Sequence, residues 1–328
     1  MENKIRKIGV FTSGGDAPGM NAAIRAVVRA CTYYKREAYG IMRGYEGMIE
    51  GDLVKLGARS VGNIIQRGGT ILKSARSEEF RTAEGRKKAF ENLQAEGLDA
   101  LVAIGGDGTF TGLHKFYEEF GIPSICIPGT IDNDLPGTDY TIGYDTATNT
   151  AVEAIDRIRD TALSHNRLFF VEVMGRNSGY IAINSGIAGG ATGIVIPEEN
   201  MTFDQLFALL GADKETSKKS NLIVVAEGSK IGDANMLAKK VAERSSYFDI
   251  KVTILGHLQR GGAPTYFDRV LASKMGIAAV EGLMQGQKDV MVGIKDNKIV
   301  YNEFKTIMTN KYHEIDAESL RIAKILSI

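Results

Sequence analysis

Short apolar runs alternate along this chain with longer segments in which apolar residues recur every three or four positions. In residues 20–34, for example, Ile24, Val27, Val28 and Cys31 fall on one face of a helix. Because strands and helices alternate over the whole length, the pattern predicts two α/β domains with largely parallel sheets. The predicted strands are residues 7–11, 38–42, 100–104, 124–127, 168–173, 193–196, 222–226 and 251–255, with a hairpin turn at 295–298. The predicted helices are residues 20–34, 84–96, a segment ending near 120, 147–163, 234–245, 268–284 and 317–326.

The strand predicted at residues 124–127 leads into two closely spaced carboxylates. Pro128 and Gly129 are expected to stop the strand, and Asp132 and Asp134 follow. In an extended chain alternate side chains point the same way, so the two carboxylates would face one site. Such a pair at the carboxyl end of a strand suits phosphoryl transfer, with one accepting a proton and the other helping to hold a metal. The alternative is that Asp-Asn-Asp is only a turn or cap sequence.

Two glycine-rich loops, residues 13–19 and 105–109, each lie between a predicted strand and a predicted helix. Free backbone N–H groups at a helix start bind phosphate oxygens, and glycine lets the backbone approach. Asp107 in the second loop could reach Mg²⁺ on a bound phosphate. Neither loop has the spacing of the dinucleotide fingerprint, and residues 68–74 do not fit a P-loop. Either loop could instead be a tight structural turn.

Composition narrows the function classes. The 328 residues suggest about two domains, and 40 Lys and Arg balance 40 Asp and Glu, so no global basic field favours nucleic acid. No apolar run approaches the length of a membrane span, and the first residues lack a long apolar signal segment. Cys31 and Cys126 lie in apolar surroundings and are expected to be buried thiols, which fits a reducing cytoplasm.

Basic residues follow several strand ends and could form a pocket for an anionic substrate. An arginine side chain binds phosphate with two parallel hydrogen bonds and stays charged. Each of these residues taken alone is more often a solvated surface charge. They are Arg76, Arg81, Arg167, Arg176, Lys251, His257 and Arg260.

Together these motifs resemble the bacterial ATP-dependent 6-phosphofructokinases, in order and over essentially the whole chain. The matching segments are residues 13–25, 105–109, 128–134, 174–176 and 256–262. The resemblance implies two Rossmann-like domains with the active site in the cleft between them, residues 1–142 plus 258–309 binding ATP and 143–257 plus 310–328 binding the sugar phosphate. It also implies transfer of the ATP γ-phosphate to the 1-hydroxyl of fructose 6-phosphate, with Mg²⁺, in a cytoplasmic homotetramer.

The same resemblance implies a role for individual residues. Asp132 would be the base, Arg176 would neutralise charge on the transferring phosphoryl group and Thr130 would orient it. Asp107 would bind Mg²⁺, with Asp134 nearby. ATP would be held by Gly15, Arg76, Ser77, Gly106, Asp107, Gly108 and Thr109. The sugar phosphate would be held by Thr130, Ile131, Asp132, Met174, Gly175, Arg176, Glu227, His257 and Arg260, with Arg167 and Lys251 reaching in from a neighbouring subunit.

Several departures from the family pattern bear on donor choice and regulation. Gly108 and Gly129 leave room for ATP, whereas pyrophosphate-dependent relatives typically carry Asp and Lys there. Lys251 stands where Arg is usual, which predicts weaker or less selective sugar-phosphate binding. The effector pocket would use Arg25, Arg29, Arg59, Arg159 and Lys218. Ala58, Thr192, Thr216 and Ser220 replace usual charged residues, which predicts blunted or altered allostery.

Three other functions share some of these sequence features. NAD and diacylglycerol kinases share Gly-Gly-Asp-Gly but do not need residues 128–134 and 257–260. A pyrophosphate-dependent enzyme is disfavoured by Gly108 and Gly129. A catalytically silent regulator would normally have lost its base, whereas Asp132, Asp107 and Arg176 are all present.

Overall fold

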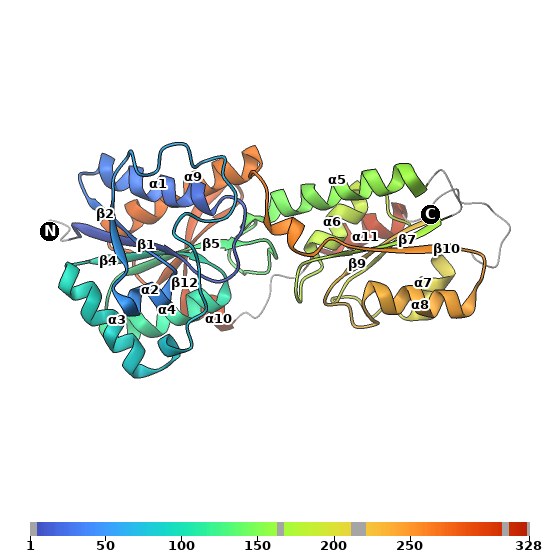
Figure 1. Cartoon of the computed structure of the whole chain (residues 1–328), viewed down its shortest axis with the longest axis horizontal. Helices are drawn as coiled ribbons and strands as arrows, with labels where there is room; N and C mark the ends of the chain where they lie inside the picture. Colours follow the sequence, from blue (N-terminus) through green and yellow to red (C-terminus); the bar gives the residue numbers. More distant parts are fainter. Residues whose placement is uncertain (1–4, 163–166, 211–220, 310–314, 327–328) are drawn as a thin grey trace. The chain divides into compact units, whose positions relative to one another are not determined.

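The computed structural model describes residues 5–162, 167–210, 221–309 and 315–326, which form two compact units (Figure 1). Both are α/β with mostly parallel sheets, which confirms the predicted fold class. Unit 1 comprises Met1–Ile131, Leu135–Asp145 and Arg260–His313. Unit 2 comprises Asp132–Asp134, Thr146–Gln259 and Glu314–Ile328.

The sheet of unit 1 has the strand order β12-β11-β5-β4-β1-β2-β3, with the short β6 paired to β5. The inner pairs are parallel, and antiparallel β3 and β12 form the two edges. Its strands are β1 (Lys7–Thr12), β2 (Glu37–Ile41), β3 (Leu53–Leu56), β4 (Ala100–Gly105), β5 (Ser124–Thr130), β6 (Ile142–Gly143), β11 (Val290–Lys295) and β12 (Lys298–Glu303). The predicted hairpin turn is confirmed at Asp296 and Asn297, which both have positive φ.

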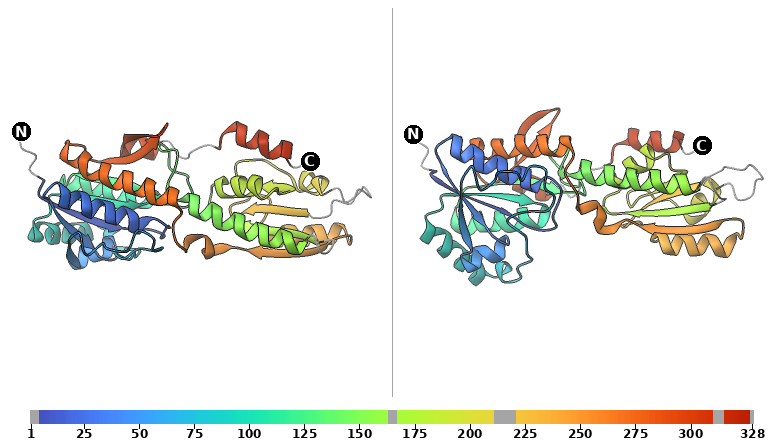
Figure 2. Two further views of the ribbon diagram at one scale, coloured as in Figure 1. Left: turned by 90° about the horizontal axis from the view of Figure 1, so that it is seen from above. Right: turned by 45° about the horizontal axis from the view of Figure 1, so that its top comes forward.

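Helices cover both faces of this sheet. On one face α1 (Met20–Tyr33) and α9 (Tyr266–Met284) lie side by side (Figure 2). They approach so closely that a Cβ on Gly276 would lie 2.6 Å from the Ala26 Cβ. The other face carries α2 (Tyr45–Glu50), η1 (Glu79–Arg81), α3 (Ala83–Glu96), α4 (Asp107–Phe120) and α10 (Phe304–Thr309).

Successive side chains of the buried strands point to opposite faces of the sheet, so each strand contributes to the packing under the helices on both faces. Leu101 and Ala103 of β4 belong to the cluster that packs under α2, α3 and α4, together with Phe110 and Phe116. Every residue of β4 is buried, as expected for a central parallel strand. Cys31 and Cys126 are also buried, as predicted, and burial raises the pKa of both thiols, that of Cys31 to about 12.

Unit 2 has a four-stranded parallel sheet in the order β10-β7-β9-β8. Its strands are β7 (Arg167–Val173), β8 (Gly193–Val195), β9 (Asn221–Ala226) and β10 (Asp249–Ile254). Helices α7 (Phe203–Leu209) and α8 (Ala234–Arg244) pack on one face, with Leu206, Leu237 and Val241 in the core. The other helices of the unit are α5 (Tyr144–Ala162), α6 (Tyr180–Ala188) and α11 (Ala317–Leu326), and the 3₁₀ turn η2 (Gly256–Arg260) follows β10.

The structure corrects the predicted end of the strand before Asp132. Strand β5 runs to Thr130, straight through Pro128 and Gly129. Proline lacks a backbone N–H, so it is tolerated in a strand only where no ladder bond needs that group. Strand β11 pairs with β5 only at Ile125 and Cys126, so it has already left the β5 edge when the chain reaches Pro128.

Candidate functional site

The glycine loops of unit 1 converge at one edge of its sheet. Adjacent parallel strands β1, β4 and β5 end together, since Thr12 is in register with Ile104 and Gly105 with Pro128. The Ser13 N–H donates to the Ile104 carbonyl at 3.0 Å, which joins the first loop to the end of β4. The edge formed by these strand ends is where open α/β sheets bind ligands.

Helix α4 begins at Asp107, directly after this edge. A Cβ on Gly105 would lie 2.4 Å from the Thr109 Oγ1 and 2.6 Å from the Ser13 carbonyl oxygen, so only glycine fits there. The α4 N-terminus presents free N–H groups and a positive dipole end, which suit phosphate. Asp107 is exposed at this start, whereas Thr109 is buried.

The two glycines predicted to decide the phosphoryl donor have different surroundings. A Cβ on Gly108 would have no neighbour within 4 Å, so the space beside the start of α4 is open. A Cβ on Gly129 would lie 2.9 Å from the Ile104 Cγ2 and 3.3 Å from the Met20 Cε. A lysine at position 129 would therefore require the packing beneath β5 to shift.

Arg260 lies over the first glycine loop. Its Nη1 would be 2.6 Å from a Cβ on Gly15 and donates to the Asp16 carbonyl at 3.1 Å. The adjoining loop also packs closely, because a Cβ on Gly68 would lie 2.2 Å from the Gly262 carbonyl oxygen. The structure thus joins Gly15 and Arg260 in unit 1, although they are far apart in the sequence.

Two buried polar residues that the sequence did not single out hold the segment leading to Arg76 and Ser77. The Asn21 side chain donates to the Arg67 and Gly68 carbonyls and accepts from the Ile71 N–H. The Thr12 hydroxyl donates to the Lys73 carbonyl at 2.7 Å. These partners lie about fifty residues apart in sequence, so no local spacing signals the contact. Arg76 is exposed, and the Ser77 Oγ accepts from the Phe80 N–H.

The segment that carries the predicted base turns sharply after β5. Thr130 ends the strand, and its carbonyl accepts from the Thr141 hydroxyl at 2.7 Å. Ile131 and Asp132 are buried, and Asn133 has φ 50°. This left-handed residue breaks the alternation of an extended chain, so the expectation that Asp132 and Asp134 point the same way for that reason is wrong.

In unit 2 the segment Met174 to Arg176 follows β7 and is held by the exposed Glu227 and the buried Gln259. The Glu227 Oε1 accepts from the N–H groups of Gly175 and Arg176, at 3.3 and 2.6 Å. The fully buried Gln259, for which the sequence suggested no role, accepts from the Met174 N–H at 2.8 Å. Gly175 and Arg176 both have positive φ, so Glu227 stabilises an unusual backbone turn. His257, which is exposed, lies two residues before Gln259 in η2.

Arg167 and Lys251 meet at a different place in unit 2. The Arg167 Nε donates to Asp249 Oδ2 at 3.1 Å, and the Lys251 Nζ lies 2.7 Å from Asp249 Oδ1. Arg167 starts β7 whereas Arg176 lies beyond its end, and strands rise about 3.3 Å per residue. Arg167 and Met174 are therefore roughly 20 Å or more apart along the strand direction, and Lys251, level with Phe169, is roughly 16 Å from Met174.

The predicted effector residues are scattered. Arg25 and Arg29 lie on α1, where burial and then the Arg29 charge lower the pKa of Arg25. Arg59 is exposed, and Arg159 of α5 donates to the Gly189 and Gly190 carbonyls. Lys218 lies outside the described residues.

A cation site of three or more His, Cys, Asp or Glu side chains is absent from the described part of the chain. Mg²⁺ does not need such a cluster, because it commonly binds one or two carboxylates plus substrate phosphates. Asp107, with its exposed carboxylate beside the open space at Gly108, can supply such a ligand.

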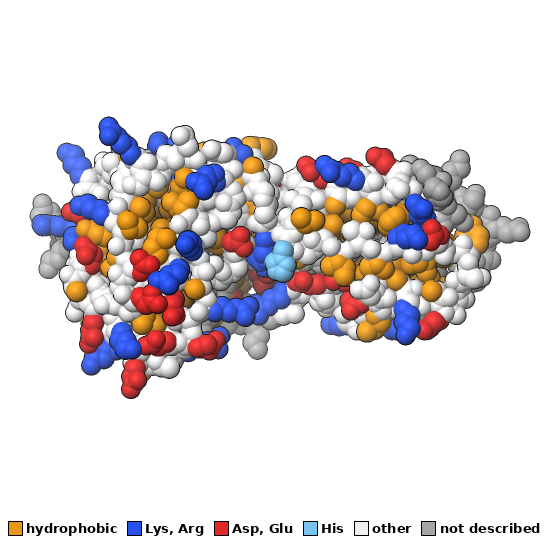
Figure 3. Space-filling view, viewed as in Figure 1, with side chains coloured by type: hydrophobic (Ala, Val, Ile, Leu, Met, Phe, Trp, Pro, Cys, Tyr) orange, Lys and Arg blue, Asp and Glu red, His pale blue; other side chains and the backbone are white. Residues whose placement is uncertain are grey.

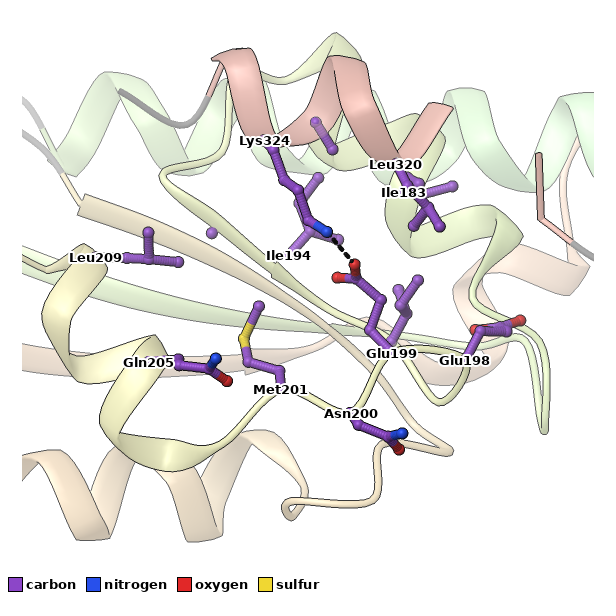
Figure 4. Close-up of a pocket in the computed structure, with 13 residues that line it drawn as sticks. Ile183, Ile194, Glu198, Glu199, Asn200, Met201, Gln205, Leu209, Leu320 and Lys324 are labelled. Atoms are coloured by element: carbon purple, nitrogen blue, oxygen red, sulfur yellow. Dashed lines mark ion pairs between the residues drawn. The ribbon is translucent and has the colours of Figure 1, made fainter. Parts of the chain in front are cut away.

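None of the predicted site residues lines either of two pockets in the described ranges. One, of about 550 Å³, lies in unit 2 between α11, α6 and α7, where Lys324 pairs with Glu199 at 2.8 Å (Figure 4). The other, of about 540 Å³, lies in unit 1 beside Tyr140, Tyr266 and Phe267.

Comparison with known proteins gives a consistent result. The family model "Phosphofructokinase" matches residues 7–283. The chain is 55% identical over 323 residues to an ATP-dependent 6-phosphofructokinase of Cytophaga hutchinsonii, covering 98% of each chain. It is 54% identical to ATP-dependent 6-phosphofructokinase 1 of Thermus thermophilus, covering 99% of this chain and all of that one.

Solved structures share the fold. A phosphofructokinase from Saccharomyces cerevisiae has a TM-score of 0.87 at 37% identity, and 97% of this chain covers 46% of that longer chain. A pyrophosphate-dependent phosphofructokinase from Marinobacter aquaeolei has a TM-score of 0.83 at 20% identity, covering 98% of this chain and 91% of that one. The second likeness concerns the fold alone. No helix in the described ranges is long and apolar enough to cross a membrane.

Proposed function

The chain belongs to the phosphofructokinase family, and on that premise we propose that it transfers the γ-phosphoryl group of ATP to the 1-hydroxyl of fructose 6-phosphate. The products are fructose 1,6-bisphosphate and ADP. The observation that carries this proposal is the full-length similarity to ATP-dependent 6-phosphofructokinases. The convergence of two glycine loops at the sheet edge of unit 1 supports it independently.

The nucleotide binds to unit 1. Gly15 and the residues from Gly106 to Thr109 hold its phosphates, with the free backbone N–H groups at the start of α4 as donors, and Arg76 and Ser77 add side-chain contacts. Mg²⁺ bound beside Asp107 would neutralise charge on the phosphates. The open space at Gly108 supports ATP as donor, since a side chain there would enter the region next to the start of α4.

Catalysis depends on positioning and charge. Asp132 accepts the proton of the sugar hydroxyl, Arg176 neutralises charge on the transferring group, and Thr130 orients that group. A carboxylate is a weak base for an alcohol, so much of the rate comes from alignment of the two substrates. The positive φ of Arg176, fixed by Glu227, supports a preset direction for this guanidinium.

The sugar phosphate is held by Ile131, Met174, Gly175, Glu227, His257 and Arg260. Arg167 and Lys251 bind its phosphate in the site of a neighbouring subunit. Their separation from Met174 to Arg176 along β7 supports this sharing, because one small substrate could not reach both ends of the strand.

The shared sites imply a homotetramer, for which unit 2 offers suitable surfaces. Hydrophobic side chains lie along the face that carries edge strand β10 (Figure 3). Ile254 is 52% exposed on this strand. We place the enzyme in the cytoplasm, in keeping with its two free, buried cysteines. Effector binding at Arg25, Arg29, Arg59, Arg159 and Lys218 is expected to be blunted.

A coupled assay tests the function. ATP and pyrophosphate are each offered with fructose 6-phosphate and with other sugar phosphates, beside the variant Asp132→Asn. We expect turnover with ATP and fructose 6-phosphate, and a fall in kcat of on the order of 10²–10⁴-fold in the variant. Asp52→Asn, which changes an exposed carboxylate paired with Arg43, is the control and should keep wild-type kcat. Near wild-type turnover by Asp132→Asn would remove this residue as the base.

A further inference from the structure

We propose that Asp249 is a positioning residue for the sugar phosphate, because its carboxylate holds Arg167 and Lys251 side by side on one edge of the unit 2 sheet. The inference rests on the proposed function, in which these two cations bind the phosphate group. Asp249 is not part of any motif that pointed to the site.

Strand register brings the three side chains together. Asp249 of β10 is directly opposite Arg167 of β7. Lys251 is two residues beyond Asp249, so the two side chains leave the same face of the edge strand. The carboxylate uses one oxygen for each cation, Oδ2 for the Arg167 Nε and Oδ1 for the Lys251 Nζ.

Electrostatics explain why a carboxylate is useful at this point. Arg167 and Lys251 would repel each other when held close enough to bind one phosphate, and a negative charge between them removes most of that repulsion. Hydrogen bonds from Lys251 and then from Arg167 lower the pKa of Asp249, so the carboxylate is charged at neutral pH. The three groups together still carry one net positive charge.

The geometry leaves donors for the ligand. Arg167 donates to Asp249 through Nε, and its Nη1 lies 3.5 Å from the Thr161 hydroxyl. These two contacts do not use all five N–H donors of the guanidinium. The ammonium of Lys251 has three donors and gives one to Asp249. Within the described residues Asp249 is the only carboxylate that forms a salt bridge with Lys251.

Lysine at position 251 makes the carboxylate more important. A lysine side chain is a flexible point charge without the planar fork that orients arginine. Fixing its ammonium beside Arg167 before the substrate arrives reduces the entropy lost on binding. A positioning role therefore predicts a higher KM for fructose 6-phosphate when the charge is removed, with little change in kcat.

The experiment compares wild type with Asp249→Asn, Asp249→Glu and the control Asp204→Asn, which changes another exposed carboxylate of unit 2, paired with Arg244. We expect KM for fructose 6-phosphate to rise roughly five- to tenfold in Asp249→Asn, with kcat within about twofold of wild type. Asp249→Glu keeps the charge and should recover most of the affinity. Asp204→Asn should leave both constants unchanged.

A double-mutant cycle separates positioning from general stability. In a Lys251→Ala background, Asp249→Asn should raise KM much less than in wild type, since one of its two partners is gone. An equal rise in both backgrounds, or an unchanged or lower KM in Asp249→Asn, would overturn the inference. If wild type does not phosphorylate fructose 6-phosphate at all, the proposed function fails as well. Turnover by wild type with unchanged KM in the variant refutes only the role of Asp249.

Discussion

Two glycines of the second loop, Gly105 and Gly108, are expected to have different roles, one in packing and one in ATP binding, and substitution can distinguish them. Gly105→Ala would push a Cβ against the Ser13 carbonyl and the Thr109 hydroxyl. We expect it to lower the free energy of unfolding by about 2 kcal/mol and to weaken ATP binding. Gly108→Ala meets open space, so it should keep the stability of the fold and raise only KM for ATP. Thermal unfolding and KM for ATP of both variants check this, and an equally stable Gly105→Ala would contradict it.

Substitution of Lys251 should change the affinity for the sugar phosphate. Lys251→Arg introduces a forked donor in place of a point charge, and Asp249 lies within reach to orient it. KM for fructose 6-phosphate should fall about threefold while kcat stays constant. Steady-state kinetics at fixed saturating ATP measure the change, and an unaltered KM would show that lysine serves equally well.

Sequence singles out an individual residue when the signal for it is local. Gly105 and Asp107 follow a strand and precede a helix, which is a local signal. Gln259 and Asp249 instead contact partners many residues away, at Met174 and Arg167. Such contacts depend on strand register, which no single stretch of sequence specifies.

Among the elements, α3 is fixed by one buried cation. Arg86 is 4% exposed, forms two hydrogen bonds with Glu119 of α4 at 2.6 and 2.7 Å, and also donates to the Phe80 and Arg81 carbonyls. Arg86→Met leaves these acceptors without their donor, so we expect a loss of about 3 kcal/mol in the free energy of unfolding. Lys88→Met, on the exposed side of the same helix, should change it by less than about 0.5 kcal/mol.

The Arg86 contact also has a pH dependence. Hydrogen bonding to Arg86 lowers the pKa of Glu119 below 4.5 in the folded protein. Its contribution to stability is therefore present above that pH and is lost as the pH falls through the lowered pKa. Chemical unfolding of wild type and Arg86→Met between pH 7 and pH 3 should show the difference narrowing toward low pH. A difference that stays constant would assign the effect to packing alone.

The secondary structure was predictable where periodicity was long or regular, as in α1, α9 and the buried strands. The short α2 is not among the helices predicted from sequence, because it begins after Gly44 and ends at Gly51, which leaves only six residues for a pattern. Strand β5 was cut short because proline usually ends a strand, and only the pairing of its neighbours explains why it does not.

For the whole molecule, the proposed sharing of active sites between subunits predicts complementation. Asp132→Asn and Arg167→Ala should each have little activity alone, since one lacks the base and the other a phosphate contact. Co-expressed subunits should regain roughly a quarter of wild-type activity, because some sites then receive both intact residues. Co-expression of Asp132→Asn with Arg176→Ala is the control and should recover nothing if both residues belong to the same subunit's site. Absence of recovery in the first pair would argue that each subunit is self-sufficient.

The order of segments in unit 1 has a consequence for synthesis on the ribosome. Strand β11, the neighbour of β5, and helix α9, the partner of α1, both come after unit 2 in the chain. Until they emerge, the face of α1 around Ala26, against which Gly276 later packs, is uncovered. The segment Thr146–Gln259, which makes up most of unit 2, can therefore complete its sheet first. The unit 1 segment Met1–Ile131 cannot complete its own fold until residues 260–313 have been synthesised. A truncated product that stops near residue 145 would expose this apolar helix face and would depend on chaperones to avoid aggregation.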